Sequence, residues 1–243
     1  MSATKLFSPL LIPQTVRKKA TASVIFLHGS GDTNMGILSW VGDLMEGEFS
    51  FPHIQTVFPT APVRPYTPFG GMPSSVWFDR MAITPQCAEH ESVDQMCDQL
   101  SHLIKDQQDK GIPINRIVLG GFSMGGAMAL HLAFRRFREV AGVFALSGFL
   151  NQDSAVYKLI EKEPGPLPAL FQGHGGKDSL VRLQWGHETF NKLKSLNVKG
   201  EFHKYPELTH EMSTDELCQL KDWISGILPD VDLDGMFYKG YAL

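Results

Sequence analysis

Short apolar runs alternate along the chain with longer segments in which apolar residues recur every three or four positions. The apolar runs predict strands at Ser23 to Leu27, Ile54 to Phe58, Arg116 to Gly120, Gly142 to Ser147, Pro168 to Gln172 and Gly200 to Tyr205. The helical spacing predicts helices at Gly36 to Glu46, Glu91 to Lys110, Gly125 to Phe137, Gln184 to Ser195 and Ser213 to Leu228. Strands that alternate with helices are typical of βαβ units. The sequence therefore predicts an α/β fold with a mainly parallel central sheet flanked by helices on both faces.

The length of 243 residues suits a single α/β domain, and no internal repeat divides the chain. We expect this domain to span residues 21–228, with an N-terminal extension at 1–20 and a C-terminal extension at 229–243. The last predicted helix begins with Ser213-x-x-Glu216, which is the pattern of a capping box.

One segment departs from the alternation of strands and helices. From Pro59 to Asp79 the chain is rich in proline and glycine, with aromatic residues interleaved among them. A loop of this length is uncommon in a compact domain unless it is functional or disordered. It is either an excursion packed by its own aromatics or a wall of a substrate pocket. On the second interpretation, Trp77 is a substrate-binding candidate.

Composition excludes several classes of protein. The chain has 22 Lys and Arg against 26 Asp and Glu, a formal net charge of −4, which disfavours nucleic acid as a partner. No apolar run approaches the roughly 20 residues of a spanning helix, so we expect peripheral membrane contact at most. The N-terminus lacks the apolar stretch of a signal peptide, and the three cysteines show no metal-ligand spacing. We therefore expect a cytosolic protein with no metal and no other cofactor.

The candidate chemistry begins at Gly121-Phe122-Ser123-Met124-Gly125. An apolar strand precedes Ser123 and a helix of small residues follows it, which is the context of the nucleophile elbow of the α/β-hydrolase fold. The flanking glycines let strand and helix approach closely, and the turn holds the hydroxyl at the positive end of the helix. The alternative is an ordinary tight turn. The strand and helix on either side favour Ser123 as a nucleophile.

A serine hydroxyl needs a base within hydrogen-bond reach and an acid that orients the base. α/β-Hydrolases supply them in the order Ser, Asp or Glu, His. The histidines after Ser123 are His174, His187, His203 and His210. His210 is the favoured base because it lies in the loop between the last strand and the last helix, whereas His203 lies in a strand and His187 on a helix. His174 directly follows a strand and is a candidate substrate-binding residue.

Two aspartates compete for the role of the acid. Asp178 ends a glycine-rich turn after the strand that finishes near Gln172, at the sheet edge where the active site is expected. Asp153 also follows a strand, but aspartate is frequent in such turns because it forms local hydrogen bonds. We favour Asp178 and keep Asp153 as the alternative.

Hydrolysis also needs backbone N–H donors for the developing oxyanion, each worth roughly 3 kcal/mol in the transition state. The amide of Met124, directly after the nucleophile, is one natural donor. The other is expected in His28-Gly29-Ser30-Gly31-Asp32, which follows an early strand, and we assign it to Ser30. The alternative is a flexible turn or a phosphate-binding loop, but no Lys-Ser/Thr of a P-loop and no G-x-G-x-x-G follows.

With these residues placed, the chain resembles the acyl-protein thioesterase and lysophospholipase family over nearly its whole length. The resemblance rests on Phe26 to Asp32, Pro59 to Pro62, Trp77 to Asp79, Gly120 to Gly126, His174 to Val181 and Tyr205 to Glu211. It implies hydrolysis of acyl esters and thioesters, including palmitoyl groups on protein cysteines, with Ser123, Asp178 and His210 as the triad. The thioesterases of the family usually have Gln where this chain has Met124. That difference keeps the backbone donor and makes shorter acyl chains the firmer expectation.

The sequence thus predicts a serine hydrolase that cleaves acyl thioesters and esters through an acyl-enzyme, on an acylated protein or a small acyl ester. The alternative within enzymes is a carboxylesterase or lysophospholipase that acts on small or lipid esters. The alternative from another class is a non-catalytic relative that binds an acyl ligand or a protein, but such relatives usually lack a triad residue. The sequence makes no prediction of the oligomeric state.

Overall fold

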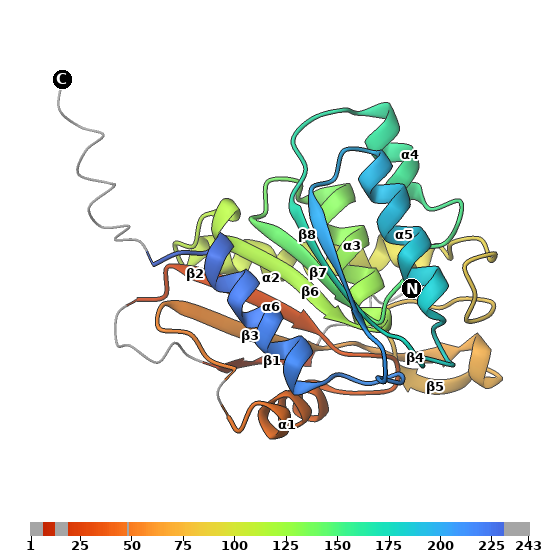
Figure 1. Ribbon diagram of the computed structural model, residues 1–243, viewed down its shortest axis with the longest axis horizontal. Helices are drawn as coiled ribbons and strands as arrows, with labels where there is room; N and C mark the ends of the chain where they lie inside the picture. The colour runs from red at the N-terminus through yellow and green to blue at the C-terminus, as the bar shows by residue number, and fades with distance from the viewer. Residues whose placement is uncertain (1–6, 13–18, 48, 231–243) are drawn as a thin grey trace.

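The computed structural model describes residues 7–12, 19–47 and 49–230, and its main element is a seven-stranded sheet (Figure 1). The strand order is β1-β3-β2-β6-β7-β8-β9. β1 pairs antiparallel with β3 at one edge, and the other six strands run parallel. The strands are β1 (Phe7–Ile12), β2 (Ala22–Leu27), β3 (Ile54–Thr60), β6 (Ile117–Phe122), β7 (Gly142–Leu146), β8 (Ala169–Gly175) and β9 (Gly200–Tyr205).

Helices cover both faces of this sheet, because alternate residues of each strand face opposite sides. Phe26 of β2 packs in one cluster with Ile37 and Ile224, which come from α1 and α6. Its neighbour Leu27 belongs to the opposite cluster, which α2, α3, α4 and α5 complete. The helices are α1 (Asn34–Leu44), α2 (Ser92–Asp109), α3 (Met124–Arg136), α4 (Ala155–Lys162), α5 (Leu183–Ser195) and α6 (Thr214–Ile227). The predicted fold class is confirmed.

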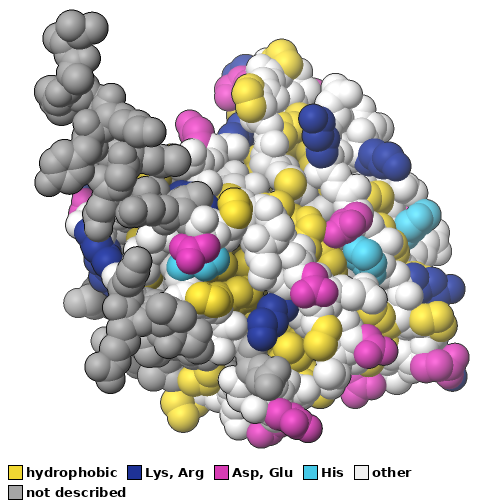
Figure 2. Space-filling view, turned by 60° about the vertical axis from the view of Figure 1, so that its left-hand side comes forward, with side chains coloured by type: hydrophobic (Ala, Val, Ile, Leu, Met, Phe, Trp, Pro, Cys, Tyr) yellow, Lys and Arg dark blue, Asp and Glu magenta, His cyan; other side chains and the backbone are white. Residues whose placement is uncertain are grey.

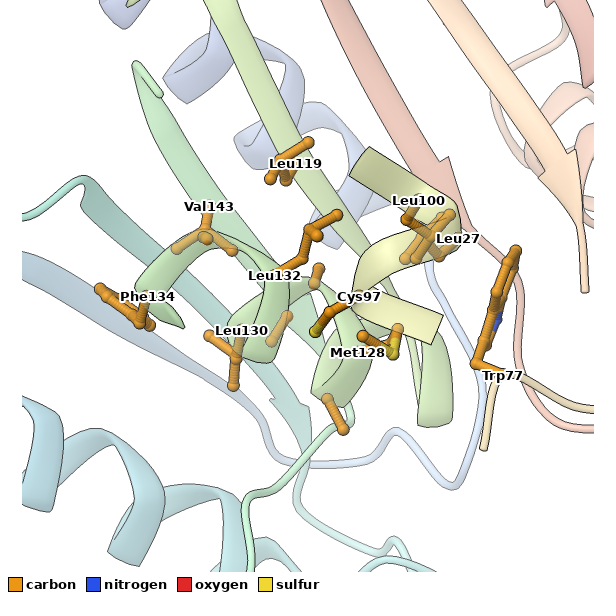
Figure 3. Packing of buried hydrophobic residues seen from close by; sticks show 14 of the residues in the cluster. Leu27, Trp77, Cys97, Leu100, Leu119, Met128, Leu130, Leu132, Phe134 and Val143 are labelled. Carbon is orange, nitrogen blue, oxygen red and sulfur yellow. The ribbon is translucent and has the colours of Figure 1, made fainter. Parts of the chain in front are cut away.

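α3 is the helix most enclosed by the core. Every residue from Met124 to Phe134 is buried. Figure 3 shows its side chains clustered with Leu119 of β6 and with Cys97 and Leu100 of α2. A helix fixed in this way also fixes the turn that precedes it, which is the turn that carries Ser123.

The predicted strands and helices are all present, with bounds displaced by a few residues at most. Two main-domain elements were not predicted. β1 lies inside the expected N-terminal extension and pairs with β3. α4 is a two-turn helix whose N-cap Ser154 accepts a hydrogen bond from the Val156 amide. Residues 1–6, 13–18 and 231–243 of the two expected extensions lie outside the described residues.

The proline- and glycine-rich segment folds into a hairpin of β4 (Val63–Tyr66) and β5 (Met72–Ser75), joined by the 3₁₀ turn η1 (Thr67–Phe69). Gly70 and Gly71 follow η1 with φ of 66° and 79°, a left-handed backbone that favours glycine. The hairpin packs through its own aromatics, since the rings of Tyr66 and Phe69 lie 5.1 Å apart. The same hairpin also supplies Tyr66 to the cleft described below, so both interpretations of this segment hold in part.

Charged side chains of both signs are interspersed on the face shown in Figure 2. Neither sign gathers into a continuous patch on that face. In the described part of the chain, no helix is long and apolar enough to cross a bilayer.

Glu216 at the start of α6 is fully buried beneath β8, and a Cβ on Gly173 would lie 2.2 Å from its Oε1. The Ser213 hydroxyl accepts the Glu216 amide at 3.2 Å, as the capping pattern predicts. Burial raises the pKa of Glu216 from 4.5 to about 8, and the Ser213 backbone offsets only part of that rise. The unfolded chain ionises first, so folding stability falls as the pH rises from about 4.5 to about 8.

Replacing Glu216 with Gln removes this titration. We expect Glu216→Gln to gain stability over the wild type as the pH rises from 5 to 8, by up to a few kcal/mol at ~1.4 kcal/mol per pKa unit. Below the ordinary pKa of the carboxyl group the two proteins should differ little. Urea unfolding across this range measures the effect, with Glu139→Gln, an exposed position, as the control. Parallel pH profiles for the wild type and both variants would contradict it.

Candidate active site

Ser123 occupies a strained turn between β6 and α3. Its φ is 54° and its ψ is −118°, a conformation rarely adopted by residues other than glycine. Its amide donates to the Leu146 carbonyl at 2.8 Å, which ties the turn to the end of β7. A Cβ on Gly121 or Gly125 would lie 2.4 or 2.2 Å from the Leu27 carbonyl oxygen. The two glycines of the motif are therefore required by the close approach of β2, β6 and α3.

The structure brings Ser123, His210 and Asp178 together. His210 Nε2 lies 3.0 Å from Ser123 Oγ, and His210 Nδ1 lies 2.7 Å from Asp178 Oδ2. The other carboxylate oxygen of Asp178 accepts the amides of Leu180 at 3.0 Å and Val181 at 2.8 Å. The Asp178 side chain is fully buried, so these bonds hold it in one orientation.

This arrangement selects the tautomer of His210. Nδ1 faces a carboxylate and therefore carries the proton, which leaves the lone pair of Nε2 toward the Ser123 hydroxyl. The ring packs against Phe122, with the two ring centres 4.9 Å apart. A neutral imidazole in this position is equipped to accept the proton of the serine hydroxyl.

The other candidates for base and acid lie elsewhere. Asp153 is exposed in the turn before α4. The His203 ring stacks on Phe171 at 4.7 Å, and the His187 ring lies against Phe202 at 5.2 Å. None of the three makes a recorded contact with Ser123 among the described residues.

His174 does not line a cleft, which corrects its assignment as a substrate contact. Its side chain is fully buried, with Nε2 2.8 Å from the Val181 carbonyl and 3.6 Å from Asp178 Oδ2. Burial lowers the pKa of His174, and the hydrogen bond to Val181 offsets part of that effect. The neutral ring donates to that carbonyl and so supports the loop that carries Asp178.

A small cleft of about 280 Å³, counting its open mouth, lies over Ser123. Its other lining residues include Ser30, Met124, Tyr66, Arg80 and Phe149. Sequence reasoning missed Arg80 and Phe149, whereas Tyr66 belongs to the segment that was weighed as a pocket wall. Tyr66 belongs to the hairpin, and Arg80 follows it along the chain. Arg80 comes directly after Trp77-Phe78-Asp79, a segment on which the family resemblance rests, and this position could have indicated that it lies at the site. Phe149 has no local signal, because only the fold brings it to the cleft.

Ser30 and Met124, whose backbone amides are the candidate oxyanion donors, both line this cleft. Met124 is the first residue of α3, so its amide has no acceptor within the helix. Ser30 lies in the loop after β2 and lines the same cleft. The two residues expected to form the oxyanion hole therefore line the same cleft as Ser123.

The loop with Ser30 is held by His28 and Trp77, both fully buried. His28 Nε2 accepts the Ala61 amide at 3.0 Å, so its Nδ1 carries the proton, and that atom lies 2.6 Å from the Gly29 carbonyl. The Trp77 indole N–H donates to the His28 carbonyl at 2.7 Å. Figure 3 shows Trp77 beside Leu27, at the end of β2. Trp77 therefore supports the loop through the His28 carbonyl. It is not among the residues that line the cleft, which corrects its assignment as a substrate contact.

The parallel sheet, the elbow and the hydrogen-bonded Ser, His and Asp define a class of protein, the serine hydrolases of the α/β-hydrolase fold. The family model of phospholipases and carboxylesterases matches residues 13–228. The chain belongs to this phospholipase/carboxylesterase family.

Named relatives agree with this assignment. The chain is 51% identical to lysophospholipase-like protein 1 of Mus musculus over 210 residues, which cover 86% of this chain and 88% of that protein. It is 34% identical to acyl-protein thioesterase 1 of Mycosarcoma maydis, over 87% of this chain and 93% of that protein. The structure of Zea mays acyl-protein thioesterase 2 has the same fold, with a TM-score of 0.77, 24% identity, and coverage of 91% of this chain and 100% of that one. The resemblance to the acyl-protein thioesterase and lysophospholipase family is confirmed.

Trp77→Phe tests whether the indole N–H supports the site. The variant keeps an aromatic ring but leaves the buried His28 carbonyl without this donor, at a cost of about 1–3 kcal/mol. We expect a lower melting temperature and about a tenfold loss of kcat on a simple acyl ester, with little change in KM, because the loop with Ser30 loosens. Trp223→Phe, on the opposite face of the sheet, is the control. Equal kcat for both variants would remove the supporting role.

Proposed function

We propose that this hydrolase works through an acyl-enzyme on Ser123, with His210 as the base and Asp178 as the residue that orients it. The observation that supports the proposal is the hydrogen-bond chain from Asp178 through His210 to Ser123 Oγ. A complete chain of this kind disfavours a non-catalytic acyl-binding role, for which a strained serine and a buried carboxylate would serve no purpose.

In the first half of the reaction, His210 Nε2 takes the Ser123 proton as Oγ attacks the acyl carbonyl. The amides of Ser30 and Met124 donate to the resulting oxyanion, and Asp178 stabilises the imidazolium. The imidazolium then gives its proton to the departing alcohol or thiol as the carbonyl re-forms. Water, deprotonated by His210, attacks the acyl-enzyme in the same geometry and releases the carboxylic acid and free Ser123.

The substrates that we propose are thioesters and esters of short acyl chains. The cleft of about 280 Å³ includes its open mouth, so the space that encloses a ligand is well below the roughly 300–1,000 Å³ of usual ligand pockets. A long chain such as palmitoyl would have to leave the cleft and expose most of its methylenes to water, which removes the hydrophobic gain of binding. The thiolate of a thioester also leaves with less protonation than an alkoxide, so both bond types fit the site.

The name of one relative, acyl-protein thioesterase 1, supports an acylated protein as a substrate. A carboxylesterase or lysophospholipase activity remains the second candidate, because the family description includes both phospholipases and carboxylesterases. We place the protein in the cytosol, which agrees with free thiols at Cys87, Cys97 and Cys218.

Labelling with a fluorophosphonate tests the nucleophile. We expect the wild type and Ser225→Ala, an exposed position on α6, to label strongly, and Ser123→Ala not to label. Asp178→Asn should keep the serine but lose about 10⁴-fold in kcat, since the imidazole then takes the wrong tautomer. In-gel fluorescence and ester turnover measure the two effects. Strong labelling of Ser123→Ala would refute the assignment.

A chain-length series tests the substrate. Matched oxygen and sulfur esters from two to sixteen carbons should give kcat/KM values that peak at short chains and fall toward palmitoyl, because the cleft holds only a few methylenes. The same series on Met124→Gln, which carries the residue usual in the family's thioesterases, shows whether this position influences the preferred chain length. A value of kcat/KM that rises steadily to palmitoyl in the wild type would contradict the short-chain proposal.

A further inference from the structure

Arg80 lies inside the cleft that contains the nucleophile. Its side chain is buried, with 7% of its surface exposed. Its guanidinium lies between two aromatic rings, 4.8 Å from the centre of Phe78 and 5.2 Å from the centre of Phe149. Phe149 lines the same cleft, together with Ser123. A permanent cation is thus enclosed in the small space over the nucleophile.

Within the described residues, no carboxylate pairs with this guanidinium. The nearest acid along the chain, Asp79, attracts the guanidinium but forms no ion pair with it. Its oxygens accept the amide and the hydroxyl of Thr67 at 2.8 and 2.6 Å, and the backbone amide of Arg80 at 2.8 Å. Glu89 faces His131 Nε2 at 3.5 Å instead. Arg80 Nε is buried without a hydrogen-bond partner, and no protein acceptor is recorded for the two terminal nitrogens.

A buried guanidinium destabilises the protein unless another interaction offsets the free energy of its desolvation. Removing an ion from water costs more free energy than contact with aromatic faces restores. Burial lowers the pKa of Arg80, but a guanidinium stays protonated in proteins. The fork of donors that it presents matches a carboxylate.

We propose that Arg80 is a specificity-determining residue that binds the terminal carboxylate of a short acyl group carried by Ser123. The preferred substrates are then half-esters and half-thioesters of short dicarboxylic acids. This inference rests on the acyl-enzyme proposed above and adds no new step to it. Attack, loss of the alcohol or thiol, and hydrolysis proceed as before, and the product is the free dicarboxylate.

The rest of the lining is consistent with a charge on the acyl side. The lining of the cleft also includes apolar side chains such as Met124, Ala127 and Val181, which suit a few methylenes. The proposal places the acyl group in the cleft, where it meets the buried cation, and the leaving group at the open mouth.

Three matched esters separate the possibilities. Phenyl hemiglutarate carries a carboxylate at the end of the acyl chain, phenyl pentanoate is its neutral counterpart, and 4-carboxyphenyl pentanoate carries the charge in the leaving group. We expect the wild type to favour hemiglutarate over pentanoate in kcat/KM by at least tenfold, after subtraction of the spontaneous rate. Hydrolysis of the 4-carboxyphenyl ester should follow the neutral ester.

Arg80→Met removes the charge but keeps an apolar chain between the two rings, and Arg80→Lys keeps the charge but loses the fork. The Met variant should abolish the preference for hemiglutarate over pentanoate, and the Lys variant should retain only part of the preference. Arg136→Met, which removes an exposed charge paired with Asp98, is the control and should keep the full preference.

The outcomes are distinct from those that test the proposed function. Failure to hydrolyse any of the three esters contradicts the proposed function itself. Pentanoate turnover with no preference for hemiglutarate, or a preference that survives in Arg80→Met, overturns the role of Arg80 alone. If Arg80→Met lowers kcat/KM for the 4-carboxyphenyl ester alone, Arg80 binds the leaving group, and its assignment to the acyl chain is overturned. If the Met variant does not fold, calorimetry on Ser123→Ala replaces it. The proposal expects tighter binding of glutarate than of butyrate, and equal affinities for the two overturn it.

Discussion

The active site depends on a single backbone approach, that of the start of α3 to the end of β2. The Leu27 carbonyl lies where a side chain on Gly121 or Gly125 would have to be, so only glycine permits the contact. This contact forces a left-handed backbone at Ser123. The strain persists because α3 is buried along its length and cannot shift to relieve it. The packing of α3 thus holds the Ser123 hydroxyl in a fixed position at the cleft.

The parts of this architecture that sequence could predict are those written in local chemistry. Buried parallel strands read as apolar runs, and the elbow reads as glycines around a serine between a strand and a helix. Chain order then led to Asp178 and His210, which the structure places in hydrogen-bond contact with each other and with Ser123. His210 was found because a loop before the last helix leaves its side chain free, whereas a strand commits His203 to a ring stack with Phe171.

The missed parts depend on contacts between distant segments. Trp77 was read as a pocket wall because it lies among aromatics near a loop, but its N–H is committed to a carbonyl 49 positions earlier. His174 was misplaced for a similar reason, since its neighbours Asp178 and Val181 enclose it. α4 is too short for its apolar spacing to stand out, and β1 has only the backbone of β3 to define it. No local pattern encodes which face of a buried side chain meets a cleft.

Some buried ionisable groups in this protein become neutral, whereas Arg80 stays charged. This difference affects substrate specificity. Burial lowers the pKa of His131 to about 4 and raises that of Glu216 to about 8, so each gives up its charge at neutral pH. Arginine cannot become neutral in this way, because its guanidinium remains protonated. Arg80 therefore keeps a charge that the described protein does not pair, in the one cleft that also holds the nucleophile. Under the proposal for Arg80, a substrate anion completes the site, and discrimination follows from the cost of leaving Arg80 unpaired beside a neutral acyl chain.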